Sequence, residues 1–283
     1  MSDTAPQTAT AATAEAPPPA AAGDGNGAIL EARGVSKIFG GLVAVDDVSF
    51  KVPRRSIVSI IGPNGAGKTT FFNMLTGLYK TSAGWIAFEG QDITRARPDR
   101  ILAAGMARTF QNIRLFATMT ALENVMVGEH ARMQAGLFGS ILRVPSVRRE
   151  ERLVRERAAE MLDYVGLRKN QFEQMSINLA YGDQRRVEIA RALASNPKML
   201  LLDEPTAGMN PNESERLRTF MQTLRDDRGL TIVLIEHDMK VVMNVSEYIT
   251  VLDHGEKIAE GKPEDVRATP RVVEAYLGKQ TGE

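Results

Sequence analysis

A glycine-rich stretch at residues 62–70 constrains the fold of this chain more than any other feature. It reads G-P-N-G-A-G-K-T-T, follows the apolar run S-I-V-S-I-I at 56–61, and precedes apolar residues at helical spacing. This order predicts a strand, a glycine-rich turn and a helix, which is the context that a phosphate-binding loop requires. Lys68 is then expected to reach the β- and γ-phosphates and Thr69 to offer its hydroxyl to Mg²⁺. The alternative is a glycine turn that binds no ligand.

Composition limits what can surround this loop. The 283 residues can fill one large domain or two modest ones. The 35 basic and 35 acidic residues cancel, so no strong net field favours nucleic acid or an anionic surface. Cysteine is absent, which excludes disulfides, thiolate metal sites and cysteine nucleophiles. No run of about 18 apolar residues occurs, so we expect a soluble chain that reaches a membrane through a partner.

Residues 1–28 are rich in Ala, Pro and Thr and contain no Lys or Arg. A secretory signal needs a basic start and an apolar block, and a transit peptide needs arginines. The composition predicts instead a disordered tail, because these residues offer no face to bury. Residues 29–283 are then expected to form a single domain.

Two buried strands are predicted to end in chemically active side chains. The run M-L-L-L-D-E at 199–204 ends in Asp203 and Glu204, and T-I-V-L-I at 231–235 is followed two residues later by His237. Continuous apolar runs are typical of parallel strands, and functional groups gather at the carboxyl ends of such strands. Asp203 could hold Mg²⁺ through water, Glu204 could polarise an attacking water, and His237 could hydrogen-bond a phosphate. The alternatives are an N-cap for the acids and a structural role for the histidine.

Two further side chains carry weaker signals. Phe39 stands in K-I-F-G-G, between short strands expected at 29–32 and 44–52. Stacking on a base is possible there, beside ordinary packing. Gln111 stands in R-T-F-Q-N, where its carbonyl oxygen could ligate a hard cation. Spacing alone makes Gln111 a surface polar residue.

The middle of the chain is predicted to be helical. We expect a helix at 122–133, a break at 136–145, and a second helix up to about residue 165 within a charged run that starts at 148. Its charges alternate in sign, which is typical of a solvated face and argues against a nucleic-acid stripe. A helical insert at about 113–195 therefore divides an α/β core. Near its end, Gly182 could place N–H groups against a phosphate or be an ordinary helix start.

Taken in order, these motifs resemble the ATP-binding subunit of ABC transporters over about residues 29–279. They are the phosphate loop, R-T-F-Q, L-A-Y-G-D-Q-R-R, four apolar residues with Asp-Glu, and I-E-H-D. Within that superfamily the chain is most similar to the ATPase of branched-chain amino acid importers. The narrower resemblance is carried by F-G-G-L at 39–42, A-R-T-F-Q-N at 107–112, A-Y-G at 180–182, A-G-M-N-P at 207–211, I-E-H-D-M at 235–239 and A-Y-L-G at 275–278. It implies an α/β P-loop NTPase fold with a mixed, largely parallel sheet core, an antiparallel β-subdomain and the helical insert.

The resemblance also implies a role for each site residue. Glu204 would act as general base, His237 would contact the γ-phosphate, and Gln111 would report the nucleotide state to a membrane subunit. Thr69, Gln111 and Asp203 would hold Mg²⁺, and Phe39 would stack on adenine. The residues expected to wrap ATP in this chain are Gly62, Asn64, Gly65, Ala66, Gly67, Lys68, Thr69 and Thr70. The residues expected to close over the nucleotide of the opposite subunit are Ala180, Tyr181, Gly182 and Asp183.

The implied assembly contains two membrane permease subunits and a second ABC ATPase subunit, identical or related, and works indirectly with a solute-binding protein. No nucleic acid is expected. The chain would be cytoplasmic, peripheral on the inner face of the cell membrane, and would power uptake of branched-chain or related amino acids.

Two places depart from the superfamily pattern. Ala180, Tyr181 and Asp183 stand where serine, glycine and glutamine are common, so the hydroxyl expected to bond the γ-phosphate is missing and backbone N–H groups must make that contact. Asn210 stands where aspartate is common.

Three alternatives remain at this point. One is the ATPase of a lipopolysaccharide exporter, against which R-T-F-Q and the long segment 132–150 argue. The second is a soluble switch protein that acts with nucleic acid; such proteins carry two ATPase halves or long coiled-coil insertions, and this chain has neither. The third is a nucleotide-binding module without turnover.

Overall fold

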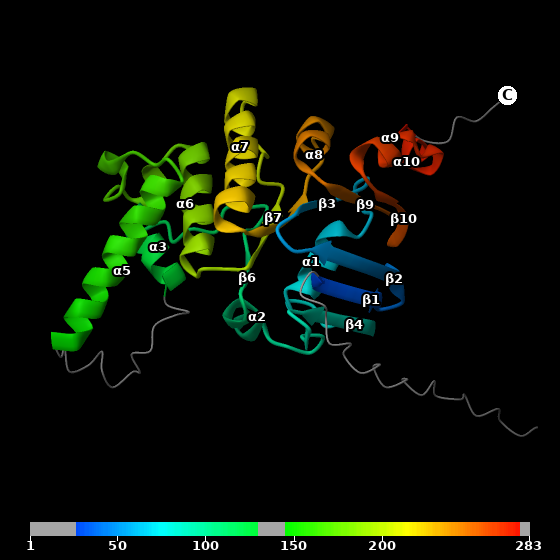
Figure 1. Cartoon of the computed structure of the whole chain (residues 1–283), viewed down its shortest axis with the longest axis horizontal. Helices are drawn as coiled ribbons and strands as arrows, with labels where there is room; N and C mark the ends of the chain where they lie inside the picture. Colours follow the sequence, from blue (N-terminus) through cyan, green and yellow to red (C-terminus); the bar gives the residue numbers. More distant parts are fainter. Residues whose placement is uncertain (1–26, 130–144, 278–283) are drawn as a thin grey trace, which may run out of the picture.

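The computed structural model describes residues 27–129 and 145–277 (Figure 1). Nearly all of the predicted tail, most of the expected helix break at 136–145, and Gly278 of the final motif lie outside the described residues. Within the described ranges, none of the helices combines the length and the apolar character needed to cross a membrane.

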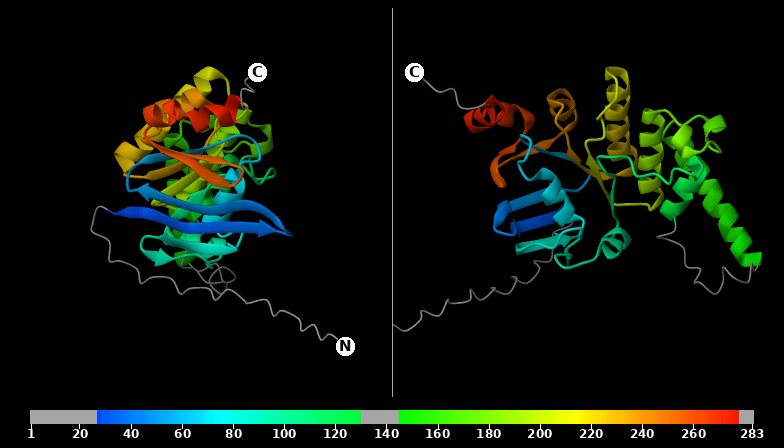
Figure 2. Two further views of the ribbon diagram at one scale, coloured as in Figure 1. Left: turned by 90° about the vertical axis from the view of Figure 1, so that its right-hand side faces the viewer. Right: turned by 180° about the vertical axis from the view of Figure 1, so that it is seen from behind.

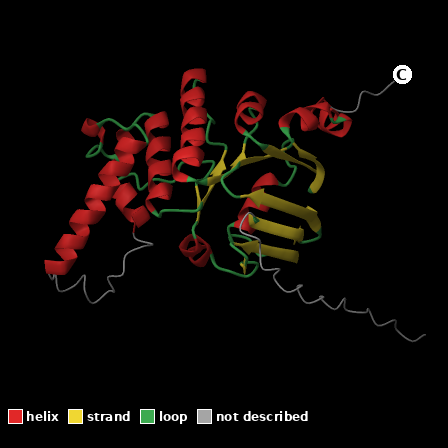
Figure 3. Cartoon of the chain, in the orientation of Figure 1, coloured by secondary structure: helices red, strands yellow, loops and turns green. Residues whose placement is uncertain are grey.

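Two sheets form the centre of the protein (Figure 3). The strands are β1 (Ala28–Phe39), β2 (Leu42–Pro53), β3 (Ile57–Ile61), β4 (Ala83–Phe88), β5 (Gln91–Asp92), β6 (Met106–Arg108), β7 (Met199–Asp203), β8 (Thr231–Ile235), β9 (Tyr248–Asp253) and β10 (Glu256–Gly261). One sheet is antiparallel, with the order β2-β1-β4-β5, and the other has the order β10-β9-β3-β8-β7-β6. In the larger sheet all neighbours pair in parallel except β10, which is antiparallel to β9. Every residue of β3, β7 and β8 is buried, as their continuous apolar sequences predict.

The helices cover the larger sheet and fill the region between β6 and β7. They are α1 (Lys68–Leu75), α2 (Pro98–Ala104), α3 (Ala121–Glu129), α5 (Pro145–Tyr164), α6 (Tyr181–Ala194), α7 (Pro211–Arg228), α8 (Met239–Val245), α9 (Pro263–Ala268) and α10 (Pro270–Leu277). Two 3₁₀ turns, Lys169–Gln171 and Ser176–Asn178, join α5 to α6.

Helix α1 lies between the two sheets, so the phosphate loop that precedes it is fixed from both sides. Its Phe71 and Phe72 are fully buried in one cluster with residues of β1 and β2 and with alternate residues of the parallel strands, such as Leu201 and Val233. Leu200 and the other strand residues that face the opposite side of the sheet belong to a second apolar cluster, together with residues of α3, α5, α6 and α7. This alternation follows from the two-residue period of a strand. Figures 1 and 2 show the resulting layers, with the helical region at the end opposite α9 and α10.

The sheet order and the helical region between β6 and β7 confirm the predicted fold class, with some local corrections. The first two strands are longer than predicted: residues 37–39 belong to β1 and only Gly40 and Gly41 form the turn, because a two-residue glycine turn closes a tight hairpin. Pro145, expected in a helix break, is the first residue of α5, a position where its missing N–H costs nothing. The extent of the insert, 113–195, and the single-domain boundary stay predictions.

Candidate functional site

The phosphate loop borders a pocket of about 560 Å³ that collects residues from five separate segments. Its lining comprises Phe39, Leu42, Val43, Ala44, residues 64–70, Gln111, Glu204 and His254. The loop, Phe39, Gln111 and Glu204 were assigned to one site from sequence, and they lie together. His237 and Asp203 are not part of the lining. His237 Nδ1 lies 3.6 Å from the carboxylate of Glu204, and Asp203 directly precedes Glu204 in the chain.

The loop has glycine where no other residue fits. Gly67 has a φ of 91°, and a Cβ on it would lie 2.4 Å from the carbonyl oxygen of Ala44. Gly62 has a φ of 148°, and a Cβ there would lie 2.0 Å from the carbonyl oxygen of Leu252. Residues other than glycine rarely adopt these φ values. In both cases the added Cβ would meet a main-chain carbonyl oxygen, which cannot move aside as the end of a side chain could. The curled shape predicted from the motif therefore depends on these two positions.

Lys68 is buried at the first turn of α1 and bends back to its own loop. Its Nζ donates to the carbonyl oxygens of Gly62 at 2.7 Å and Pro63 at 2.8 Å. Burial lowers the pKa of Lys68, while the charges of Glu204 and Asp203 act in the opposite direction. A partly desolvated ammonium held by two neutral acceptors is well suited to an incoming anion, because phosphate oxygens are stronger partners for its charge than carbonyls.

Glu204, which lines the pocket, lies close to two other polar side chains. Its Oε2 accepts a hydrogen bond from Gln111 Nε2 at 2.9 Å and lies 3.6 Å from His237 Nδ1. Its backbone has a left-handed φ of 46°, and its N–H donates to the Ile235 carbonyl oxygen at 2.9 Å. A non-glycine residue in this conformation is strained, and such strain persists where surrounding contacts hold it. The segments that follow β6, β7 and β8 thus place one carboxylate between an amide and an imidazole.

Asp203, the last residue of β7, forms a buried ion pair that its sequence did not predict. Its Oδ2 accepts from Arg108 Nη2 at 2.8 Å, and both side chains are nearly inaccessible. Burial raises the pKa of Asp203, whereas the hydrogen bond and charge of Arg108 lower it. The other oxygen, Oδ1, is buried and has no hydrogen-bond partner among residues 27–129 and 145–277. An unsatisfied carboxylate oxygen of this kind fits a hard cation or its coordinating water.

A magnesium ion would need ligands from the nucleotide as well as from the protein. No group of three or more His, Asp and Glu side chains within 27–129 and 145–277 is arranged to hold a metal ion alone. Mg²⁺ in nucleotide sites is bound through one or two protein oxygens, waters and phosphates, so the hydroxyl of Thr69 and the oxygens of Gln111 and Asp203 suit that mode.

Phe39 is held at the rim of the pocket by two neighbours. The Tyr79 ring meets it edge to face at 5.3 Å between centroids, and Lys37 Nζ lies 4.8 Å from its centroid. The Phe39 side chain remains partly exposed. A ring fixed in this way can offer a face to a base.

Sequence reasoning missed the buried pair of Arg185 and Glu188 on α6. Their side chains are 0% and 1% exposed and joined by a 2.6 Å contact. Arg185 donates to the carbonyl oxygens of Phe110 and Gln111, and Glu188 accepts from the N–H groups of Phe110 and Arg114. Helix α6 is therefore hydrogen-bonded to the main chain of the segment that carries Gln111. The sequence feature that could have revealed this pair is two opposite charges three residues apart on an otherwise apolar face of the helix.

Glu236 and His254 were also missed. Glu236 is fully buried and accepts from the N–H of Thr206 at 2.9 Å and from its hydroxyl, which joins the turn after β7 to the end of β8. His254 lies in the β9–β10 turn, far along the chain from the loop, and still lines the loop pocket. Nothing local in the sequence distinguishes either residue.

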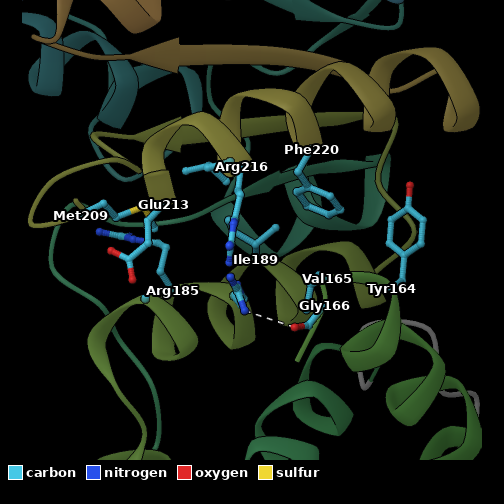
Figure 4. Close-up of a pocket in the computed structure, with 12 residues that line it drawn as sticks. Tyr164, Val165, Gly166, Arg185, Ile189, Met209, Glu213, Arg216 and Phe220 are labelled. Carbon is cyan, nitrogen blue, oxygen red and sulfur yellow. Dashed lines mark hydrogen bonds between the residues drawn. The ribbon is translucent and has the colours of Figure 1, made fainter. Parts of the chain in front are cut away.

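Residues 180–183 do not line the loop pocket. Gly182 instead lines a second pocket of about 340 Å³ between the end of α5, α6 and α7 (Figure 4). Two carboxylates lie at this helix start. Glu213 Oε1 is 3.1 Å from where a Cβ on Gly182 would sit, and Asp183 accepts from Gln171 at 2.7 Å and Arg186 at 3.2 Å. Within one chain, the loop and the start of α6 thus belong to different sites.

Comparison with known proteins agrees with this geometry. The ABC transporter family model matches residues 45–207, and the branched-chain amino acid ATP-binding cassette transporter model matches residues 256–280. The high-affinity branched-chain amino acid transport ATP-binding protein BraF of Pseudomonas aeruginosa is 46% identical over 252 residues, covering 89% of this chain and 98% of the relative.

Two solved structures extend the comparison to the fold. An ATP-binding cassette of an ABC transporter in its ADP conformation has a TM-score of 0.77 and 35% identity, covering 89% of this chain and 99% of the other. The dimeric structure of a post-hydrolysis cassette bound to ADP and phosphate has a TM-score of 0.71 and 27% identity, covering 83% and 98%. The chain therefore belongs to the ABC transporter ATP-binding family and, within it, to the branched-chain amino acid transport ATP-binding proteins.

Proposed function

We propose that this chain binds and hydrolyses ATP to power an importer of branched-chain or related amino acids. The observation that carries the proposal is the carboxylate of Glu204, 2.9 Å from Gln111 Nε2 and 3.6 Å from His237 Nδ1 beside the phosphate loop. The cargo is inferred from the relative named above and from the match at residues 256–280. These matches also favour the importer over the lipopolysaccharide exporter and the soluble switch protein.

Hydrolysis needs a base beside the γ-phosphate. In the proposed step, Glu204 takes a proton from a water that adds to the γ-phosphorus, and the bond to the β–γ bridging oxygen breaks. Gln111 and His237 orient this carboxylate and contact the water or the phosphate. Lys68 leaves the carbonyls of Gly62 and Pro63 for the phosphate oxygens. Thr69, Gln111 and Asp203 would hold Mg²⁺, which neutralises phosphate charge when bound.

The second half of the site is proposed to come from another ATPase subunit. Residues 180–183 stand apart from the loop pocket of their own chain, so they are available to cover the nucleotide of a partner. A conformational change at the nucleotide would reach the permeases through Gln111, because Arg185 of α6 donates a hydrogen bond to the Gln111 carbonyl oxygen. A closure at the start of α6 would then move the segment that contacts both the nucleotide and the membrane subunit.

Uptake in whole cells tests the transport function. Removing the chain should abolish ATP-dependent uptake of radiolabelled leucine, isoleucine and valine, and wild-type chain supplied in trans should restore it. The Glu204→Gln chain should assemble with membrane proteins and fail to restore uptake. Unchanged uptake of all three amino acids without the chain would refute the cargo, while phosphate release by the assembled complex separately tests the ATPase.

A further inference from the structure

Arg108, the last residue of β6, contacts three segments that carry residues of the nucleotide site. β6 is the edge strand of the larger sheet and pairs in parallel with β7 (Figure 1). In this register Arg108 lies opposite Leu201, two residues before Asp203. The Arg108 side chain is only 7% exposed. A long cationic side chain on an edge strand is therefore packed against the protein instead of extending into water.

Hydrogen bonds fix the Arg108 guanidinium to two elements. Nη2 donates to Asp203 Oδ2 at 2.8 Å, at the end of β7. Nη1 donates to Asn73 Oδ1 at 2.7 Å and to Thr76 Oγ1 at 3.1 Å. Asn73 lies in α1 and Thr76 is the C-cap of that helix, which begins at Lys68. The guanidinium therefore joins the end of β7 to the helix that follows the phosphate loop.

Two aromatic rings contact the same guanidinium. The ring centroids of Phe72 and Phe110 lie 5.4 Å and 5.2 Å from Arg108 Cζ. Phe72 belongs to α1 and is fully buried, and Phe110 directly precedes Gln111. A planar guanidinium that is bonded through both terminal nitrogens and lies over two rings has few other orientations open to it. Arg108 is therefore a rigid partner for Asp203 and touches the segment that carries Gln111.

The ion pair leaves the two oxygens of Asp203 in different states. Oδ2 accepts from Arg108, whereas Oδ1 is buried and accepts no hydrogen bond from residues 27–129 and 145–277. Buried polar atoms are normally paired, so an unpaired carboxylate oxygen is suited to a cation or to a water bound to it. A turn of the carboxylate would carry Oδ1 away from its position. The bond from the fixed guanidinium to Oδ2 opposes that turn.

We propose that Arg108 is a positioning residue for the metal of the nucleotide complex: by holding Oδ2 of Asp203, it keeps Oδ1 oriented for Mg²⁺ or a water bound to Mg²⁺. Because Asn73 and Phe110 help to hold Arg108, the orientation of this carboxylate depends on α1 and on the segment before Gln111. The inference deepens the proposed function, since it rests on binding of ATP with Mg²⁺ at the phosphate loop.

The test compares Arg108→Lys with the wild type in the full-length chain. Lysine keeps a positive charge beside Asp203 but lacks the planar fork that reaches Asp203 and Asn73 together. Mn²⁺, which is visible by EPR, replaces Mg²⁺, and its Kd is measured with a non-hydrolysable ATP analogue and an excess of chain. Arg108→Lys should weaken Mn²⁺ binding about three- to tenfold, the effect of about one hydrogen bond. The Kd of the analogue in EDTA should stay within about twofold of the wild type, because the loop is unchanged.

Two further variants separate positioning from folding, with Tm measured for each. Asn73→Ala removes one bond to Arg108 and keeps the ion pair, so Mn²⁺ binding should weaken about two- to threefold. This variant decides the inference if Arg108→Lys does not fold. Arg114→Met is the control, because the guanidinium of this exposed arginine lies over the same Phe110 ring, 4.3 Å from its centroid. It should bind Mn²⁺ as the wild type does.

Mn²⁺ binding and analogue binding together decide the outcome. Wild-type Mn²⁺ affinity in Arg108→Lys overturns the inference, and so does a loss of Mn²⁺ affinity that is matched by an equal loss of analogue affinity in EDTA. A wild-type chain that binds neither the analogue nor Mn²⁺ refutes the proposed function. A wild type that binds both, with Arg108→Lys binding Mn²⁺ equally well, refutes this inference alone.

Discussion

The phosphate loop and the start of α6 both contain a glycine at the start of a helix, and the sequence predicts a phosphate contact at each. They differ in the charges around them and in their backbone conformation. The loop curls through glycines of positive φ and presents Lys68. Gly182 lies inside a regular helix, with the carboxylates of Asp183 and Glu213 beside it. The loop is therefore an anion site on its own. In the proposed function, the start of α6 would need a nucleotide whose charge the loop of another subunit already balances, which would explain why one chain holds two incomplete sites.

The largest expected effect concerns chemistry, which belongs to the loop side alone. Glu204→Gln should reduce ATP turnover by about 10² to 10⁴ while ATP binding persists, because the proposed general base is lost and the loop is untouched. Asp183→Asn is the matched change on the α6 side and should alter turnover less than about threefold, since an amide oxygen can still accept from Gln171. Phosphate release and nucleotide binding measure both. Wild-type turnover by Glu204→Gln would refute the division of roles.

The next effect concerns the connection between the two regions. Arg185→Met should destabilise the chain by about 3–5 kcal/mol, because it leaves the buried Glu188 carboxylate without its cationic partner and two main-chain carbonyls without their donor. Replacing Arg185 and Glu188 together by Met and Leu should cost less than Arg185→Met alone. Urea unfolding of both single variants and the double variant gives the coupling free energy. Additive losses would show that the pair does not act as a unit.

The buried pair also marks where sequence reasoning ended. The positions of the loop, Asp203, Glu204 and His237 in the fold could be predicted because each depends on a short pattern: a strand before glycines, or acids and a histidine after an apolar strand. Parallel pairing then places those strand ends together. The hydrogen bonds from Arg185 to the Phe110 carbonyl oxygen and from the Thr206 N–H to Glu236 join residues 75 and 30 positions apart. Such contacts depend on the packed position of whole helices and on side-chain rotamers, which no local pattern fixes.

A glycine-to-alanine pair sharpens the backbone difference. Gly67→Ala should lower the free energy of unfolding by at least about 2 kcal/mol, because it combines a left-handed residue with a Cβ 2.4 Å from the Ala44 carbonyl oxygen. Gly182→Ala should stay within about 1 kcal/mol of the wild type, since alanine favours a helix and the group in its way is the mobile end of Glu213. Chemical denaturation compares the two. Equal losses would mean that Gly182 is as constrained as the loop.

The smallest effect tests charge at the start of α6. Glu213→Gln removes a carboxylate beside Gly182, where the N–H groups of α6 are proposed to meet a partner's phosphate. Charges at a helix terminus contribute about 0.3–1 kcal/mol, so ATP-dependent dimers should tighten about two- to fivefold. Glutamine can keep the 3.0 Å bond from the Asn210 N–H, so the capping box and Tm should persist.

Sedimentation velocity with ATP, in a Glu204→Gln background that slows hydrolysis, measures this dimer affinity. Glu215→Gln on the same helix is the control, because Glu215 is exposed and pairs with Arg218. If Glu213→Gln changed dimer affinity no more than Glu215→Gln, the carboxylate would not oppose phosphate at α6, and the contrast between the two helix starts would rest on glycine geometry alone. A tighter dimer with an unchanged Tm would instead show that the negative charge at α6 is what makes this half of the site depend on the other.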